Sequence, residues 1–125
     1  MAYSDQQELA LQQIKKCCDS LEDRKAEAIL VLDLKGISSV ADYFVIATGN
    51  SVPQLRAMRD GVVSGLKDIG VIVSCVESEP QSGWIVIDVF DIILHLFLPE
   101  QRDYYSLEAL WRDAKIVTQE VRTEV

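Results

Sequence analysis

The spacing of hydrophobic positions divides the chain into helical and strand-like segments. Apolar residues three and four apart predict an amphipathic helix from Ser4 to about Ser20, and residues 4–7 fit a capping box at its start. The charged stretch 22–25 then predicts a loop. Two short apolar runs rich in branched side chains, residues 28–32 and 43–47, predict strands that are covered on both faces.

A Gly-Asn-Ser turn at residues 49–51 predicts the start of a second helix. Pro53 suits its first turn, and Gly70 suits a left-handed end. The buried stripe of this helix is predicted to be Leu55, Met58, Val62, Leu66 and Ile69. A third strand is expected at residues 71–76, followed by a polar loop at 77–83.

Residues 84–88 and 91–98 predict a β-hairpin that turns at Val89 and Phe90. This turn would pair Asp88 with Asp91, Val86 with Ile93 and Trp84 with His95. Alternation then gives one uniformly aliphatic face, the expected core face: Ile85, Ile87, Ile92, Leu94 and Leu96. The other face mixes a tryptophan and polar groups with apolar residues: Trp84, Val86, Asp88, Asp91, Ile93, His95 and Phe97. Such a mixture suits a partly covered surface or an interface.

Pro99 ends the predicted sheet, and Ser106 is expected to cap a final helix after a short helical turn. The apolar positions of that helix are Leu107, Leu110, Trp111, Ala114 and Val117. The resulting order, αββαβββα, predicts an α/β fold with a mixed five-stranded sheet flanked by helices. The 125 residues suit one domain, residues 1–125, with an N-terminal helix and loop at 1–26 and a core at 27–118.

Composition and charge narrow the function classes. No apolar run reaches about 18 residues, so no membrane span is expected. The N-terminus lacks the order of a signal peptide, and three cysteines are an odd number, so a reducing, cytoplasmic location is expected. Cys17 and Cys18 are adjacent on a predicted helix without companion ligands, which favours packing over a redox or metal role. The net charge of −8 disfavours direct nucleic-acid binding and favours a basic protein partner.

His95 is the one histidine of the chain, which excludes a site with several histidine ligands. It could ligate a metal together with Asp88 and Asp91, but a hydrogen-bonded structural or interface role is the preferred interpretation. Asp88 and Asp91 are most simply turn residues. Trp84 and Trp111 both suit the core, although Trp84 follows a polar loop and also suits an interface anchor. No metal or cofactor is expected.

The turn Gly49-Asn50-Ser51 between strand and helix could bind phosphate, and it resembles the start of a nucleotidyltransferase active site. Those enzymes need a carboxylate pair on a strand to hold divalent metal. No carboxylate follows Ser51 before Asp60, which is on the helix, and residues 77 and 79 are glutamates placed in the expected loop. A turn with a helix cap is therefore preferred. Without Walker, dinucleotide or serine-elbow motifs, no catalytic residues and no enzyme activity are expected.

Three sequence blocks, VLDLKGISSVADYFVIATGNS, GWIVID and YYSLEALWRDA, resemble the Iojap family, also called ribosomal silencing factors. The resemblance spans about residues 28–114. It implies a fold related to nucleotidyltransferases but without their catalytic residues. It also implies binding to the large ribosomal subunit through universal large-subunit protein fourteen, which blocks the small subunit and represses translation. In isolation, family members are expected to form homodimers.

The resemblance also implies which residues contact the partner: Trp84, Asp88, Asp91, His95, Tyr105 and Glu108. Two positions depart from the family pattern. Phe90 stands between the hairpin aspartates where the family usually has glycine, and Ser78 replaces the glycine of a Glu-Gly pair. A looser turn, or one that tolerates a bulky residue, is therefore expected at Phe90. The alternative functions are a metal-dependent nucleotidyltransferase-type enzyme and an adaptor for another basic protein.

Overall fold

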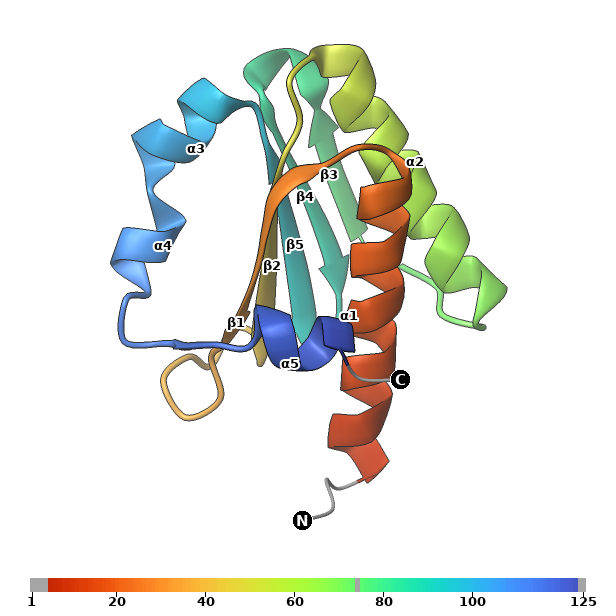
Figure 1. Ribbon diagram of the computed structural model, residues 1–125, viewed down its shortest axis with the longest axis vertical. Coiled ribbons are helices and arrows are strands. Elements are labelled where there is room, and N and C mark those ends of the chain that lie inside the picture. The colour runs from red at the N-terminus through yellow and green to blue at the C-terminus, as the bar shows by residue number, and fades with distance from the viewer. Residues whose placement is uncertain (1–4, 74, 124–125) are drawn as a thin grey trace.

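The computed structural model describes residues 5–73 and 75–123, which form a mixed β-sheet with helices on both faces (Figure 1). The described helices are α1 (Asp5–Asp23), α2 (Val52–Asp68), the short 3-10 helix η1 (Pro80–Ser82), α3 (Pro99–Tyr105), α4 (Leu107–Leu110) and α5 (Thr118–Thr123). The strands are β1 (Glu27–Asp33), β2 (Tyr43–Thr48), β3 (Cys75–Glu79), β4 (Trp84–Val89), β5 (Ile92–Phe97) and β6 (Lys115–Ile116). Of the described helices, none is long and apolar enough to cross a membrane.

The strand order is β3-β4-β5-β2-β1-β6, with β2 and β5 parallel and the other neighbours antiparallel. The predicted α/β class and mixed five-stranded sheet are confirmed. The two-residue β6 adds a sixth strand at the edge of β1. The parallel pair arises because α2 carries the chain from β2 to β3 at the far edge, so that β5 returns to the middle of the sheet.

One face of the sheet is covered by α1 and α2, which lie side by side (Figure 1). The aliphatic face of the hairpin packs here, as predicted: Ile85, Ile87, Ile92, Leu94 and Leu96 are all buried in this main core. Cys17 and Cys18 are buried in the same core, which confirms their packing role. Burial raises the pKa of the Cys17 thiol far above its ordinary value, so Cys17 stays neutral.

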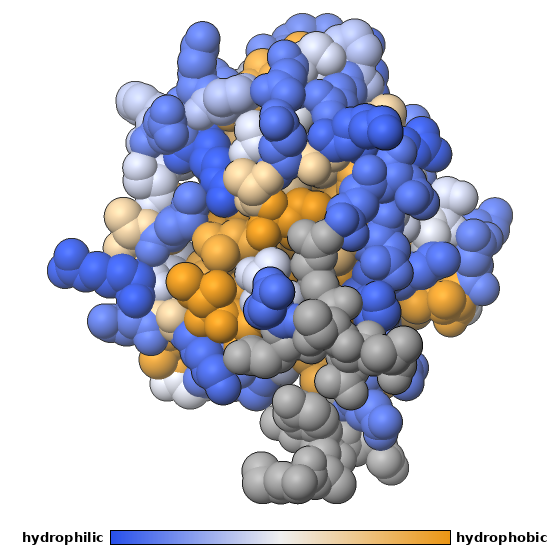
Figure 2. Space-filling view, viewed as in Figure 1, coloured by the Kyte–Doolittle hydropathy of each residue, from blue (hydrophilic) through white to orange (hydrophobic). Residues whose placement is uncertain are grey.

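The opposite face has a smaller, second core. Its buried members are Leu32, Leu34, Ala41, Phe44, Ile46 and Phe97. Trp84, Leu107 and Trp111 pack against them and are partly buried. In the same view, apolar surface gathers near the centre of the molecule with hydrophilic surface around it (Figure 2). On this second face Val86, Asp88 and Ile93 are only partly buried, so the sheet is covered less completely than on the main core side.

Two elements in the first half differ from the predicted boundaries. Helix α1 continues through Asp23, and Lys25 then takes a left-handed conformation at φ 65°. The expected capping box at residues 4–7 begins at Ser4, which lies outside the described residues. Helix α2 matches its prediction more closely, because Ser51 is its N-cap and Gly70 adopts φ 81° after its end. Ile69, however, is exposed and does not extend the buried stripe.

The third strand is placed wrongly by the sequence pattern. Strand β3 spans Cys75–Glu79, so it includes part of the predicted polar loop, while residues 71–73 are irregular. Val71 and Val73 are apolar because they pack against the main core, not because they pair in the sheet. An edge strand needs a partner on only one side, and β3 therefore tolerates a polar sequence.

The single final helix expected after Ser106 is also wrong. Ser106 lies at φ 46°, where it ends α3 and precedes the four-residue α4. Its hydroxyl donates to the carbonyl of Asp103 and makes no cap to α4. Lys115 and Ile116 instead pair with the open edge of β1, and α5 follows. Pairing with an open strand edge outweighs the helical spacing of the apolar residues.

The hairpin register differs from the predicted one by two residues. The turn consists of Phe90 and Asp91, so that Val89 pairs with Ile92. Asp88 therefore lies opposite Ile93, Val86 opposite His95, and Trp84 opposite Phe97. A shift of two keeps each strand residue on its predicted face, because side chains alternate with a period of two. Asp91 alone leaves the predicted face and becomes a turn residue.

Phe90 sits in the tight turn with φ 60° and an exposed side chain. A β-carbon in the left-handed region costs about 1–2 kcal/mol. We expect Phe90→Gly to stabilise the fold by about 0.5–1 kcal/mol after the extra chain entropy of glycine is subtracted. Urea unfolding measures the change. Phe90→Ala is the matched control, since it removes the ring but keeps the β-carbon; equal stabilisation by both variants would contradict the argument.

Candidate partner-binding surface

Four aromatic rings from three elements form one cluster on the second face, which we call the aromatic cluster: Trp84, His95, Phe97 and Tyr105. The Trp84 ring centroid lies 4.4 Å from that of Tyr105 and 5.2 Å from that of Phe97. Tyr105 is the last residue of α3, so the short helix after Pro99 brings it over the hairpin. Phe97 is fully buried while Tyr105 is 44% exposed, so the cluster runs from core to surface.

His95 is buried within this cluster and is hydrogen-bonded, as predicted. Its Nδ1 accepts a hydrogen bond of 3.1 Å from the indole nitrogen of Trp84, and Phe44 packs edge-on at 4.6 Å between ring centroids. Burial lowers the pKa of His95 to about 4, so the ring is neutral at neutral pH. Since Nδ1 accepts, the proton is on Nε2, which is buried without a partner among the described residues. His95 thus holds the Trp84 ring in place.

Arg102 is the residue that the sequence reasoning missed. Its Nη1 donates to the carbonyl of Ala28 at 2.6 Å and to the hydroxyl of Thr48 at 2.8 Å. Its Nε donates to the Glu108 carboxylate at 3.2 Å, so one side chain joins α3 and α4 to the ends of β1 and β2. Glu108 is therefore held by an ion pair to Arg102 on α3, the helix that ends at Tyr105. Nothing in the local sequence signals a contact across 74 residues.

We expect Arg102→Met to lower the free energy of unfolding by about 2 kcal/mol, because it removes three hydrogen bonds from a charged donor that is mostly shielded from water. Urea unfolding is the measurement. Arg102→Lys keeps the charge but not the planar array of donors, so it should recover only part of the loss. Unchanged stability in Arg102→Met would show that α3 does not depend on this anchor.

The other candidate residues are spread more widely. Asp88 shares the face of Trp84 but lies four residues along β4, about 13 Å away at the usual rise of a strand. Asp91 is exposed in the turn and borders the helix-covered side of the sheet. The structure therefore brings together Trp84, His95 and Tyr105, ties Glu108 to α3 through Arg102, and does not bring in the two aspartates. Within the described part of the chain, no group of three or more His, Cys, Asp or Glu side chains could hold a metal ion.

The Gly49-Asn50-Ser51 turn behaves as a helix cap. The Ser51 hydroxyl accepts from the Gln54 amide at 3.1 Å, and the Asn50 amide donates to the Gln54 side chain at 2.7 Å. The side-chain Nε2 of Gln54 in turn donates to the backbone carbonyls of Arg24 and Lys25. These bonds occupy amides that a phosphate would need, and they favour the interpretation as a turn with a cap.

The carboxylate argument needs one correction. Glu77 and Glu79 are on strand β3 and not in a loop, although their side chains lie outside the described residues. The order β3-β4-β5-β2 nevertheless places β3 three strands from β2, whose end carries the Gly49 turn. At the usual strand spacing this separation is about 14 Å, too far for one metal site to serve both places.

An α/β domain with an aromatic cluster that reaches the surface, and an acidic net charge, has the features of a small binding module. The family model described as "Ribosomal silencing factor during starvation" matches residues 7–125. The ribosomal silencing factor RsfS of Bacillus subtilis is 38% identical over 103 residues, which cover 82% of this chain and 87% of that protein. The RsfS of Zymomonas mobilis is 43% identical over 98 residues, covering 78% of this chain and 74% of the relative.

Similarity extends to solved structures and to plastid proteins. A crystal structure of a Chromobacterium violaceum protein matches with a TM-score of 0.77 and 35% identity, covering 81% of this chain and 84% of that one. The chloroplastic protein Iojap of Arabidopsis thaliana is 35% identical over 96 residues, 74% of this chain and 38% of that longer protein. The chain therefore belongs to the ribosomal silencing factor family.

Proposed function

We propose that this chain is a non-enzymatic, cytoplasmic repressor of translation. It binds the large ribosomal subunit through universal large-subunit protein fourteen and prevents the small subunit from joining. The observation that carries the proposal is membership of the ribosomal silencing factor family over residues 7–125. The net charge of −8 supports a basic protein as the partner.

The aromatic cluster supplies the anchor of the proposed contact. Tyr105 is half-exposed and rests on Trp84, whose indole is fixed by His95. A partner side chain that packs on Tyr105 therefore contacts a surface that is already ordered. Binding does not require this surface to become ordered first. Asp88 and Glu108 are proposed to face basic side chains of the partner on this side of the sheet, whereas Asp91 borders the other face and is not part of this contact. In isolation, two copies can use the same aromatic surface to form a homodimer in competition with the ribosome.

Light scattering of purified ribosomal subunits tests the proposal. Excess protein should lower the fraction of joined ribosomes, and a matched amount of Tyr105→Ala should not. Sedimentation of cell extract then shows whether the chain travels with large subunits. Normal subunit joining at saturating protein would reject the proposal, and co-sedimentation with a different basic protein only would favour an adaptor.

We expect affinity for the large subunit to fall as salt rises. Exposed charges are screened over about 10 Å at 0.1 M and about 3 Å at 1 M salt, so attraction between an acidic domain and a basic surface weakens. Titrations between about 0.05 and 0.5 M potassium chloride should show a steady loss of affinity. An affinity that does not change over this range would show that electrostatic attraction does not contribute to binding.

A further inference from the structure

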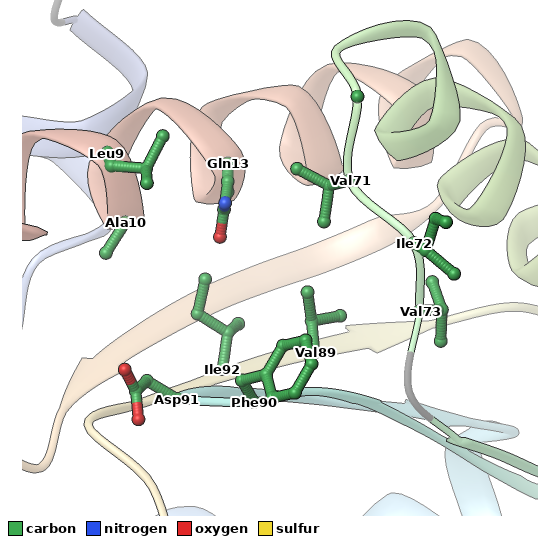
Figure 3. A pocket seen from close by; sticks show the side chains of 11 residues that line it. Leu9, Ala10, Gln13, Val71, Ile72, Val73, Val89, Phe90, Asp91 and Ile92 are labelled. Carbon is green, nitrogen blue, oxygen red and sulfur yellow. The ribbon is translucent and has the colours of Figure 1, made fainter.

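A groove of about 580 Å³ lies on the helix-covered face, away from the aromatic cluster. It is formed by the first half of α1, the irregular segment 71–73 and the tip of the hairpin (Figure 3). Figure 3 shows Leu9, Ala10 and Gln13 on one side and Val89, Phe90, Asp91 and Ile92 on the other, with residues 71–73 along one end, at the right of the view. Gln13 and Asp91 provide the polar side chains, and the remaining walls are apolar.

Large apolar side chains surround this groove in contact with water. Leu9 is 54% exposed, Phe90 is 71% exposed and Ile72 is 81% exposed. Single exposed apolar residues are ordinary, but three around one hollow form a patch of the kind that binds a partner. Their exposure also means that the groove opens to the surface, so it suits a polypeptide laid across it better than an enclosed small molecule.

Phe90 provides a second, independent observation. The turn holds it at φ 60°, a conformation that suits glycine, and places its ring at the groove. The exposed ring leaves this strain largely uncompensated within the chain. Strained backbone that presents an exposed side chain is typical of contact sites.

The charges around the groove indicate the chemistry of the occupant. Asp91 is exposed at the hairpin tip, and the described residues that line the groove include no lysine, arginine or histidine. A second copy of the chain carries the same net charge of −8, so its charge does not complement Asp91 at this groove. A cationic segment is attracted, both by Asp91 directly and by the domain as a whole.

We propose that this groove docks an amphipathic, cationic polypeptide segment of a second partner. An apolar side chain of the segment enters between Leu9, Ile72 and Phe90, and a lysine or arginine pairs with Asp91. The proposal goes beyond the proposed repressor function, because the groove and the aromatic cluster lie on opposite faces of the sheet. A chain bound to the ribosome through the aromatic cluster can still hold this second partner.

Fluorescence anisotropy tests the docking site with a labelled synthetic peptide that carries leucines at helical spacing and lysines elsewhere. The full chain should bind it, and the same peptide with glutamate in place of lysine should not bind. Phe90→Gly and Ile72→Ser should each weaken binding about 10-fold or more, as expected when a central anchor is truncated. Phe90→Gly also relieves the turn, so lost binding cannot be attributed to unfolding.

Leu110→Ser is the matched control, because Leu110 is equally exposed but lies on α4, on the other side of the sheet. Its affinity for the peptide should equal that of the unaltered chain, and amide chemical shifts should change around residues 9–13, 71–73 and 89–92. Equal loss in Leu110→Ser, unchanged binding in Phe90→Gly, or shifts on the aromatic cluster would overturn the proposal. So would a dimer that dissociates on Phe90→Gly, since a second copy would then be the occupant.

Discussion

Tyr105→Ala is expected to weaken binding to large ribosomal subunits by about 30- to 1000-fold, the range that 2–4 kcal/mol from a truncated aromatic anchor gives. Tyr105 is 44% exposed and packs on Trp84 at 4.4 Å between ring centroids. Because half of its surface already faces water, its removal should change the melting temperature only slightly. Surface plasmon resonance with immobilised subunits measures the affinity, and calorimetry measures the stability.

Tyr104 offers a matched control for this experiment. It is 81% exposed, and among the described ring contacts it meets only the Tyr105 ring, edge-on. Tyr104→Ala should therefore cost much less affinity than Tyr105→Ala. Equal losses of affinity in the two variants would mean that the cluster is not the anchor. Full affinity in Tyr105→Ala would show that Tyr105 does not contribute to partner binding.

Trp84 is a less clean test, because the structure gives it two roles. Its ring packs on Phe97 in the second core, and its indole nitrogen donates to His95. Trp84→Ala therefore removes core contacts and leaves a buried histidine nitrogen unpaired, so it should lower both stability and binding. Lost binding in Trp84→Ala would not distinguish loss of core packing from loss of a partner contact, whereas Tyr105→Ala distinguishes the two.

The two faces of the hairpin were predictable because alternation is a local property. The division between the Ile85 face and the Trp84 face is correct even though the strand register was wrong by two residues. The register was missed because it depends on which two residues form the turn, and nothing in the sequence indicated that Phe90 takes a φ of 60° as the first of them. A shift of one residue would have reversed the faces, and a shift of two preserved them.

Features that depend on distant contacts were not predictable from one sequence. Arg102 joins α3 to β1 and β2, and β6 joins the C-terminal part of the chain to the edge of β1. These distant contacts outweigh the preferences of the local sequence, because the helical spacing of apolar residues after Ser106 would otherwise give one long helix. The clustering of Trp84 with Tyr105 belongs to the same arrangement, because Tyr105 is the last residue of α3, which Arg102 joins to β1 and β2.

Acid should destabilise this chain through His95 by about 3 kcal/mol in total. Burial lowers the pKa of His95 in the fold to about 4, while its ordinary value is 6.5. Above pH 6.5 neither the folded nor the unfolded state binds the proton, so His95 contributes no pH dependence. Between pH 6.5 and 4 the unfolded state is protonated and the folded state is not, so the free energy of unfolding falls as pH falls. Below pH 4 the contribution is constant.

His95→Gln isolates this effect from the carboxylates, which also titrate in acid. Glutamine keeps an acceptor for the Trp84 indole but carries no titratable proton. Urea unfolding at pH 7 and pH 5 should show that the unaltered chain loses about 2 kcal/mol more than His95→Gln over this interval. Because the chain has one histidine, the NMR signal of its ring also reports the pKa directly. A ring that titrates near 6.5 in the folded protein, or equal losses in the two proteins, would show that the Trp84–His95 pair is open to water and that the aromatic cluster is less well ordered than its geometry requires.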